Sequence, residues 1–165
     1  MANHTDQTIQ TKQTLKTNIP EIIALVGAIA GLAVYLVTST TGYMAGQGVS
    51  VAAIALSVVA IVALIVKIVL GSRLGDVLND VLTVGSEALL IGGFALFVLA
   101  RVRLAADIYF IPVNYPASEE TALNISVIGV ACYLIAIIAL IVKAFTAKDV
   151  ARAVISVEPA APAVA

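Results

Sequence analysis

Four long blocks of almost purely apolar residues dominate this chain of 165 residues. They lie at about 21–42, 49–70, 79–101 and 120–145. Each block is long enough for a helix of about 20 residues, which crosses the roughly 30 Å hydrocarbon core of a bilayer. The blocks do not alternate apolar and polar residues, which disfavours a transmembrane barrel. Because backbone polar groups in lipid must bond within their own segment, we predict an all-α polytopic membrane protein with four helices in a bundle.

The composition supports this class of protein. Hydrophobic residues make up 61% of the chain and charged residues only 12%, whereas soluble domains carry about 25% charged residues. Nine Lys and Arg oppose ten Asp and Glu, and this balance excludes the concentrated basic patch that nucleic-acid binding needs. We therefore expect the lipid bilayer as the main partner and no nucleic acid.

The polar and apolar segments divide the chain into three parts. A polar leader at 1–19 precedes a transmembrane domain at 20–147, and the apolar density falls again at 148–165. The leader argues for a retained first helix rather than a cleaved signal peptide, since such peptides begin with only a short charged region. We expect the last part to be a disordered cytoplasmic tail.

Capping patterns predict where individual helices begin and end. Asn18 stands three residues before Glu21, with a proline between them, which is typical of a helix start. With Asp76 as its cap and Pro112 as its stop, the third helix can run for about 30 residues. Such a helix is about 45 Å long. It must therefore tilt, project outward or break near Arg101.

The positions of Lys and Arg predict the orientation. If four helices cross, seven basic residues share the side of the two chain ends, and only Arg101 and Arg103 lie opposite. Cytoplasmic segments carry the excess of Lys and Arg. We expect a multi-pass protein of a cell membrane with both termini in the cytoplasm. The seven residues are Lys12, Lys16, Lys67, Arg73, Lys143, Lys148 and Arg152.

Small residues at helical spacing predict close contacts between helices, because helices in lipid associate through close packing. Gly27 and Gly31 form a GxxxG pattern in the first helix. Gly85 and Gly92 share a stripe on the third helix, and Gly129 begins one on the fourth. We interpret these stripes as contacts within one bundle. A homo-oligomer formed through the first helix is the alternative.

The first candidate site is polar and lies inside the third block. Glu87 lies seven residues beyond Asp80 and shares a helix stripe with it and with Thr83. Carboxylates at such depth are costly and often functional. Lys67 and Lys143 are the basic partners at the same end of neighbouring spans. Two interpretations stay open: a polar lock between helices, or a site that handles an ion or substrate.

The second candidate site is the outer segment between the third and fourth helices. Arg103 and Asp107 are four residues apart and would face each other on a continuing helix. The two outer arginines either receive an anionic ligand or partner, or reach the lipid phosphates and pair with Asp107. The residues of this segment that we single out are Arg101, Arg103, Asp107, Tyr109, Tyr115, Glu119 and Glu120.

Motifs for catalysis or cofactor binding are absent from the sequence. Cys132 is the single cysteine and lies in an apolar block, and the single histidine, His4, lies in the leader. No phosphate-binding loop, metal-ligand cluster or nucleophile elbow occurs. We therefore expect a protein that is not an enzyme and binds no cofactor or metal.

The run from Asp107 to Pro116, continued by Ala117-Ser118-Glu119-Glu120, is similar to small four-span bacterial membrane proteins, some of which are labelled as transporter permease components. The resemblance extends over most of the chain and brings no site residues. It implies a transport-associated protein, either an accessory or a minor permease component, with a transporter subunit as partner. The connection from Gly71 to Asp80 is too short for the coupling helix of ATP-driven permeases. A membrane scaffold without a translocation path is the alternative.

Overall fold

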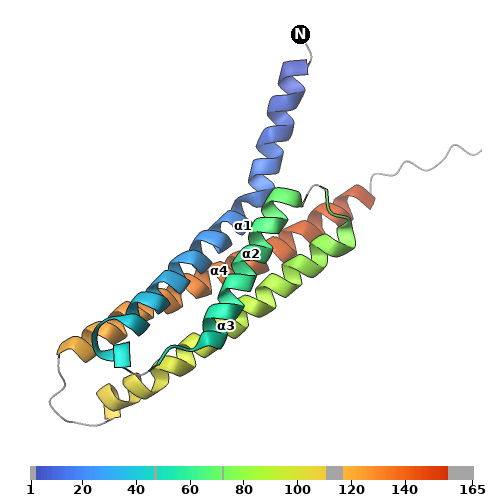
Figure 1. Cartoon of the computed structure of the whole chain (residues 1–165). Helices are drawn as coiled ribbons and strands as arrows, with labels where there is room; N and C mark the ends of the chain where they lie inside the picture. Colours follow the sequence, from blue (N-terminus) through green and yellow to red (C-terminus); the bar gives the residue numbers. More distant parts are fainter. Residues whose placement is uncertain (1–2, 47, 72, 111–116, 156–165) are drawn as a thin grey trace, which may run out of the picture.

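The computed structural model describes residues 3–46, 48–71, 73–110 and 117–155. The described residues form helices and connections and contain no strand, so the all-α prediction is confirmed (Figure 1). The elements are α1 (Asn3–Thr40), the short 3-10 helix η1 (Gly42–Gly46), α2 (Val51–Leu70), α3 (Asp76–Phe110) and α4 (Ala117–Ile155).

Each of the four α-helices contains a segment long and apolar enough to cross a membrane. These spans are Asn18–Thr40, Val51–Leu70, Val77–Phe110 and Ala117–Phe145. Many of their large apolar side chains point outward, including Val26, Val62 and Ile138. An outward apolar surface of this extent needs lipid around it. The chain is a multi-pass integral membrane protein.

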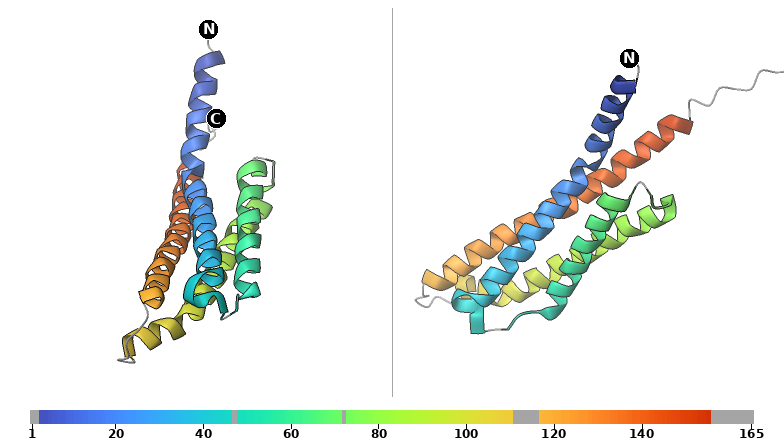
Figure 2. Two further views of the ribbon diagram at one scale, coloured as in Figure 1. Left: turned by 60° about the vertical axis from the view of Figure 1, so that its left-hand side comes forward. Right: turned by 45° about the horizontal axis from the view of Figure 1, so that its top comes forward.

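The helices pack as two antiparallel pairs. α1 lies along α4, and α2 lies along α3 (Figures 1 and 2). Contacts of α1 with α2 and of α3 with α4 complete the bundle. The start of α1 and the end of α4 lie at the same end of the bundle, as four crossings require (Figure 2). We call this the inner end and the opposite one the outer end; that the inner end faces the cytoplasm remains the prediction from Lys and Arg.

Two helices extend beyond the bounds that the sequence predicts. α1 begins at Asn3 rather than near Asn18 and continues through Pro20. Because proline lacks an N–H group and crowds the preceding turn, a helix bends there, and the first part of α1 leaves the bundle at an angle (Figure 1). α4 continues to Ile155, so the expected disordered tail begins with helix. The remainder of that tail, 156–165, lies outside the described residues.

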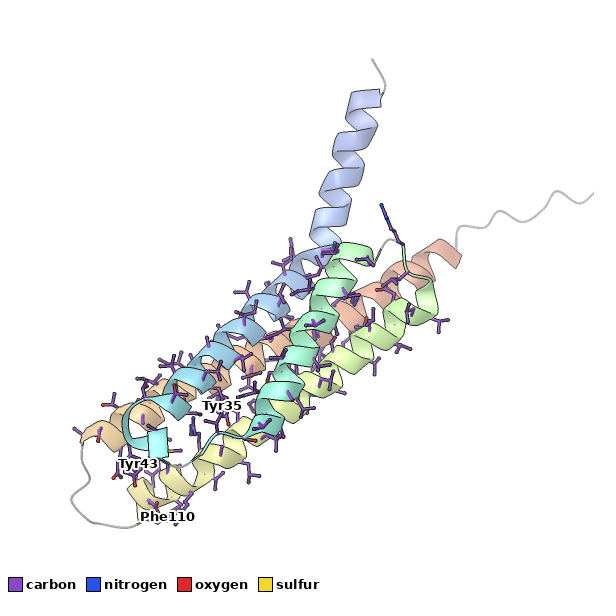
Figure 3. All side chains as sticks on the ribbon, viewed as in Figure 1. Tyr35, Tyr43 and Phe110 are labelled. Atoms are coloured by element: carbon purple, nitrogen blue, oxygen red, sulfur yellow. The ribbon has the colours of Figure 1, made fainter. Side chains whose placement is uncertain are left out.

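α3 is the longest span and does not break near Arg101. It runs for 35 residues from Asp76 to Phe110, which is about 52 Å of helix. Its last turns project past the outer end of α2, and Phe110 is labelled there in Figure 3. The exposed Tyr109 and Phe110 rings end the helix.

The core of the bundle combines small residues with three aromatic rings that pack edge to face. The Phe97 ring packs edge to face against the Tyr35 and Tyr133 rings. The distances between ring centres are 5.0 Å and 6.0 Å, respectively. All three residues are buried (Tyr35 is labelled in Figure 3). Such pairs add about 0.5–1.5 kcal/mol beyond the area that they bury. The rings therefore fix α1, α3 and α4 against one another.

The GxxxG pattern of α1 faces α4 within the same chain. A Cβ atom at Gly27 would lie 2.9 Å from the carbonyl oxygen of Cys132, and one at Gly31 would lie 2.6 Å from Cδ2 of Tyr133. Only glycine allows the helices to approach so closely. This face of α1 is therefore occupied inside the bundle.

The other glycines that the sequence singles out differ in how much room a side chain would have there. A Cβ atom at Gly129 would lie 2.8 Å from the Phe97 ring, and one at Gly92 would lie 3.1 Å from Leu56. A Cβ atom at Gly85 would meet no side chain or neighbouring helix within 4 Å among the described residues. A Cβ atom at Gly93, which the stripe on the third block did not include, would lie 2.7 Å from Oγ of Ser57. Packing on α3 thus uses Gly92 and Gly93 rather than Gly85.

Candidate functional site

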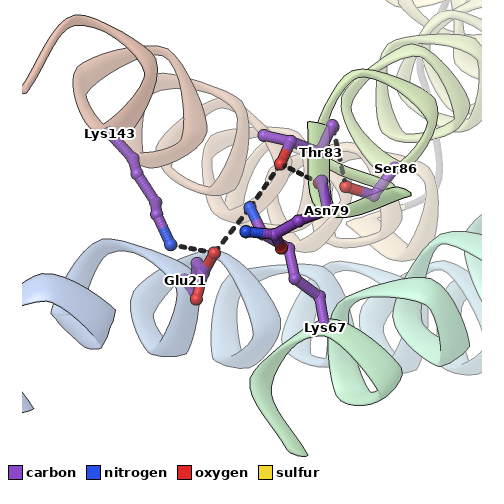
Figure 4. Close-up of polar contacts among 6 residues, drawn as sticks. All are labelled: Glu21, Lys67, Asn79, Thr83, Ser86 and Lys143. Carbon is purple, nitrogen blue, oxygen red and sulfur yellow. Dashed lines mark hydrogen bonds and ion pairs between the residues drawn. The ribbon is translucent and has the colours of Figure 1, made fainter. Parts of the chain in front are cut away.

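Three charged side chains from three helices meet inside the inner end of the bundle (Figure 4). Oε1 of Glu21 on α1 lies 2.6 Å from Nζ of Lys67 on α2. The same oxygen forms an ion pair with Nζ of Lys143 on α4. The Glu21 and Lys67 side chains are 2% and 4% exposed, and that of Lys143 is 15% exposed. We call these three residues the inner cluster.

Polar groups of α3 surround the Lys67 end of the inner cluster (Figure 4). Nζ of Lys67 donates to Oγ1 of Thr83, which in turn donates to the carbonyl oxygen of Asn79 at 2.8 Å. Oγ of Ser86 donates to the carbonyl oxygen of Thr83 at 2.9 Å. Oδ1 of Asn79 is buried and has no hydrogen-bond partner among the described residues. α3 thus contributes hydroxyl, carbonyl and amide groups but no charge.

The charges of the inner cluster do not balance. With all three groups ionised, two ammonium groups share one carboxylate, which leaves one net positive charge. Removing an ion from water costs several kcal/mol, so each buried charge depends on its partners. Each of the three residues lies within three residues of the inner end of its span. The cluster therefore sits near the inner boundary of the apolar layer.

A second buried charge lies in the outer half of the bundle. Arg101 on α3 is 5% exposed. Its Nη2 donates to Oγ1 of Thr38 at 2.9 Å and to Oγ of Ser39 at 2.7 Å, both on α1. Its Nε donates to Oγ of Ser126 on α4 at 3.1 Å. One guanidinium therefore joins three helices through neutral hydroxyl groups.

Two aromatic rings complete the surroundings of Arg101. Its guanidinium carbon lies 5.4 Å from the centre of the Tyr35 ring and 5.5 Å from that of Phe97. Ring faces attract cations, more strongly where water is excluded. Oη of Tyr35 accepts a hydrogen bond of 2.9 Å from the backbone N–H of Ser50. Within the part of the chain that the structure describes, no carboxylate forms an ion pair with Arg101.

The structure brings together only part of the predicted inner site. Lys67, Thr83 and Lys143 meet as expected from their position in the spans. Glu87 is half-buried and Asp80 is exposed. Among the described residues, neither acid forms a hydrogen bond or ion pair with the cluster. The acid that pairs with the lysines is Glu21 and not Glu87.

Sequence reasoning missed Glu21 because it reads Glu21 as a helix-capping residue. A glutamate three residues after Asn18 matches a capping pattern, and in the structure the helix simply continues through both positions. The positions of the charged residues in their spans could nevertheless have indicated the cluster. Antiparallel spans bring their inner ends to one level, so Glu21, Lys67 and Lys143 share a depth.

The residues of the predicted outer segment also do not form one cluster in the structure. Arg101 turns into the bundle, so its expected reach toward lipid phosphates is wrong. Arg103 and Tyr109 are exposed, and Asp107 is half-buried. Within the described chain, Arg103 and Asp107 form no ion pair, although the helix continues through both.

The remaining outer residues lie at the start of α4 or beyond the described chain. Glu119 is buried and Glu120 is exposed, and both belong to the first turn of α4, as predicted. Acids in a first turn are favourable because of the helix dipole. Tyr115 lies outside the described residues. The outer segment is therefore not one recognition surface in the part that can be described.

Two hollows lie along the seam between α1 and α4. The inner hollow has a volume of about 350 Å³ and extends along α1 from Ile22 to Ala30. The outer hollow, of about 320 Å³, lies between Thr38 on α1 and Ser118 on α4. No set of three His, Cys, Asp or Glu side chains in the described residues could hold a metal ion.

The chain matches no protein-family model, no curated protein and no solved structure.

Proposed function

We propose that this integral membrane protein is transport-associated, as a small permease component or an accessory to one, in the bacterial cytoplasmic membrane. The observation that supports this proposal is the inner cluster, in which Lys67 and Lys143 share the carboxylate of Glu21 inside an apolar bundle. Ionisable residues within membrane spans are rare and mark ion or substrate pathways. We assign ion handling to this cluster and not to Glu87.

Glu21 is the residue through which the cluster would act. Its carboxylate holds a lysine from α2 and a lysine from α4. A proton on this carboxylate removes the charge that attracts both lysines, and two like charges then face each other. Protonation of Glu21 would therefore loosen the contacts among three helices at once. This couples the occupancy of the site by a proton to the packing of the bundle, as alternating access requires.

Polar groups between the two ends of the bundle extend the case for a pathway. Oη of Tyr133 and Oγ of Ser57 lie 2.7 Å apart and are buried. They lie between the inner cluster and Arg101 along their helices. Hydroxyl pairs of this kind can relay a proton, although they also join helices. Tyr133 and Ser57 are thus the groups that we expect between the two charged ends.

Proton movement into liposomes tests the proposal. The purified chain is reconstituted into vesicles that contain a pH-sensitive dye, and the decay of an imposed pH gradient is followed. We expect faster decay than in empty vesicles, and a rate lowered about tenfold or more by Glu21→Gln, which is about 1.4 kcal/mol. Glu87→Gln is the matched control, because Glu87 is also an acid in a span but lies outside the cluster, and should retain the rate. Equal rates for both variants would contradict the assignment to Glu21.

A membrane scaffold without a translocation path is the second candidate. It is favoured by the two hollows described above, since both lie on the seam between α1 and α4 and are lined largely by exposed residues. In that case the buried charges serve to lock helices. A scaffold should co-purify with a stoichiometric partner and should leave the vesicle pH gradient unchanged.

A further inference from the structure

The inner hollow is a groove of about 350 Å³ with purely apolar walls. α1 supplies residues from Ile22 to Ala30, and α4 supplies Cys132 and Ile135. Small residues, Gly27 and Ala30, form part of its floor, while Ile22 and Ile23 are exposed beside it. In a bilayer, a groove with these walls holds hydrocarbon rather than water.

The groove leads along α4 toward Lys143. Lys143 follows Cys132 by eleven residues, which is about three turns of 3.6 residues, so both side chains lie on nearly the same face of the helix. Lys143 lies two residues before the end of the span at Phe145. This is the depth at which lysine reaches the lipid headgroups. Lys143 therefore lies beyond the inner end of the groove, on nearly the same face of α4 as Cys132, although it is not one of the residues that line the groove.

The charge imbalance of the inner cluster is located at Lys143. Lys67 lies 2.6 Å from Glu21, also donates to Thr83, and is 4% exposed. Lys143 has Glu21 as its partner and is 15% exposed. The uncompensated positive charge is thus most accessible at Lys143, beside the groove. An anion at this place would balance the cluster.

We propose that this groove binds one anionic phospholipid, with its phosphate at Lys143 and an acyl chain between α1 and α4. Cytoplasmic leaflets are rich in anionic lipids and attract basic groups near the membrane surface. The lysine supplies the selectivity for the headgroup, and the groove supplies the affinity for the chain. The outer hollow differs, since hydroxyl groups of Thr38, Ser118 and Thr121 stand in its walls. The proposal does not depend on a transport role.

Native mass spectrometry of the full chain in detergent tests this site with two probes, phosphatidylglycerol and phosphatidylcholine of identical acyl chains. We expect one phosphatidylglycerol per chain to be retained about five-fold better, which is the effect of one lysine near a membrane surface. Lys143→Gln should abolish this preference, while Glu21 keeps Lys67 as partner. Lys143→Arg should keep it. The control is Arg73→Gln, a charge removed from an exposed position at the same end.

A second pair of variants tests the groove itself. Ala30→Phe fills the groove and should lower the retention of both lipids, whereas Ala55→Phe, on the exposed face of α2, should not. Circular dichroism of each variant confirms that it folds. Equal retention of the two lipids by the unaltered chain would overturn the proposal. Displacement of the lipid by soluble glycerol phosphate would also overturn it, because the site would then bind a free anion.

Discussion

Nη2 of Arg101 donates a hydrogen bond of 2.7 Å to Oγ of Ser39, and both residues are almost completely buried. This contact shows how the outer half of the bundle holds a charge among hydroxyl groups and ring faces. The inner end uses a different solution, in which the carboxylate of Glu21 neutralises a lysine directly. A carboxylate that binds a proton loses the charge that attracts a lysine. A hydroxyl group is neutral and has no such charge to lose. The two ends should therefore respond differently to substitution.

Arg101→Lys should destabilise the bundle, although it conserves the charge. The guanidinium donates hydrogen bonds to Thr38, Ser39 and Ser126 at once. The ammonium group of lysine is not planar and cannot reproduce this geometry. We expect the free energy of unfolding to fall by about 2 kcal/mol, since hydrogen bonds to charged groups contribute about 1.5–3 kcal/mol each. Unfolding in mixed micelles, followed by circular dichroism, measures it. The control, Arg103→Lys, is exposed and should change it by less than about 0.5 kcal/mol.

Glu21→Ala should destabilise the bundle more than any other single change at the inner end. It leaves Lys67 and Lys143 buried as two like charges without a carboxylate. Removing one partner of a buried ion pair costs about 3–5 kcal/mol, and we expect a loss within this range. The same unfolding assay measures it.

Replacing all three charges together should restore most of that loss. Buried ion pairs exchanged for apolar residues of similar volume are often neutral or stabilising, so we expect a variant with methionine at Glu21, Lys67 and Lys143 to regain most of the stability. A triple variant that is less stable than Glu21→Ala would contradict the view that the uncompensated lysines cause the loss.

Gly31→Ala and Gly85→Ala should have opposite effects. A methyl group at Gly31 would lie 2.6 Å from the Tyr133 ring, and overpacking of this kind costs about 1–3 kcal/mol. A methyl group at Gly85 would meet no side chain or neighbouring helix within 4 Å in the described part of the chain, so alanine should stabilise the helix by up to about 1 kcal/mol. The difference between the two variants in the unfolding assay is the measurement. Loss of stability in both would indicate that Gly85 has a contact outside the described chain.

The number, type and approximate positions of the spans follow directly from the sequence. Apolar blocks of sufficient length specify a membrane helix without reference to its neighbours. The helix ends are less predictable, because Pro20 neither starts nor stops α1. A capping pattern is local, whereas a helix continues wherever its backbone bonds remain favourable. The pattern at Asn18 and Glu21 was therefore a poor guide to the start of α1.

The rotation of each helix about its axis decides which polar residues meet, and the sequence does not specify it. Glu87 and Thr83 share a stripe, yet Thr83 meets Lys67 while Glu87 stays outside the cluster. Arg101 turns inward because Ser39 and Ser126 on two other helices offer acceptors at its level. This pairing of a donor on one helix with acceptors on two others depends on how the three helices pack, so it is seen only in the assembled bundle.

The orientation can be tested with one cysteine at each end of the bundle. In a Cys132→Ala background, Thr41→Cys places a thiol at the outer end and Arg73→Cys places one at the inner end, both at exposed positions. Because Lys and Arg are in excess on cytoplasmic segments, a membrane-impermeant maleimide should label position 41 in intact cells and position 73 only after lysis. The reverse pattern would show that the inner cluster faces the cell exterior. The anionic lipid would then have to come from the outer leaflet, and both chain ends would lie outside the cytoplasm.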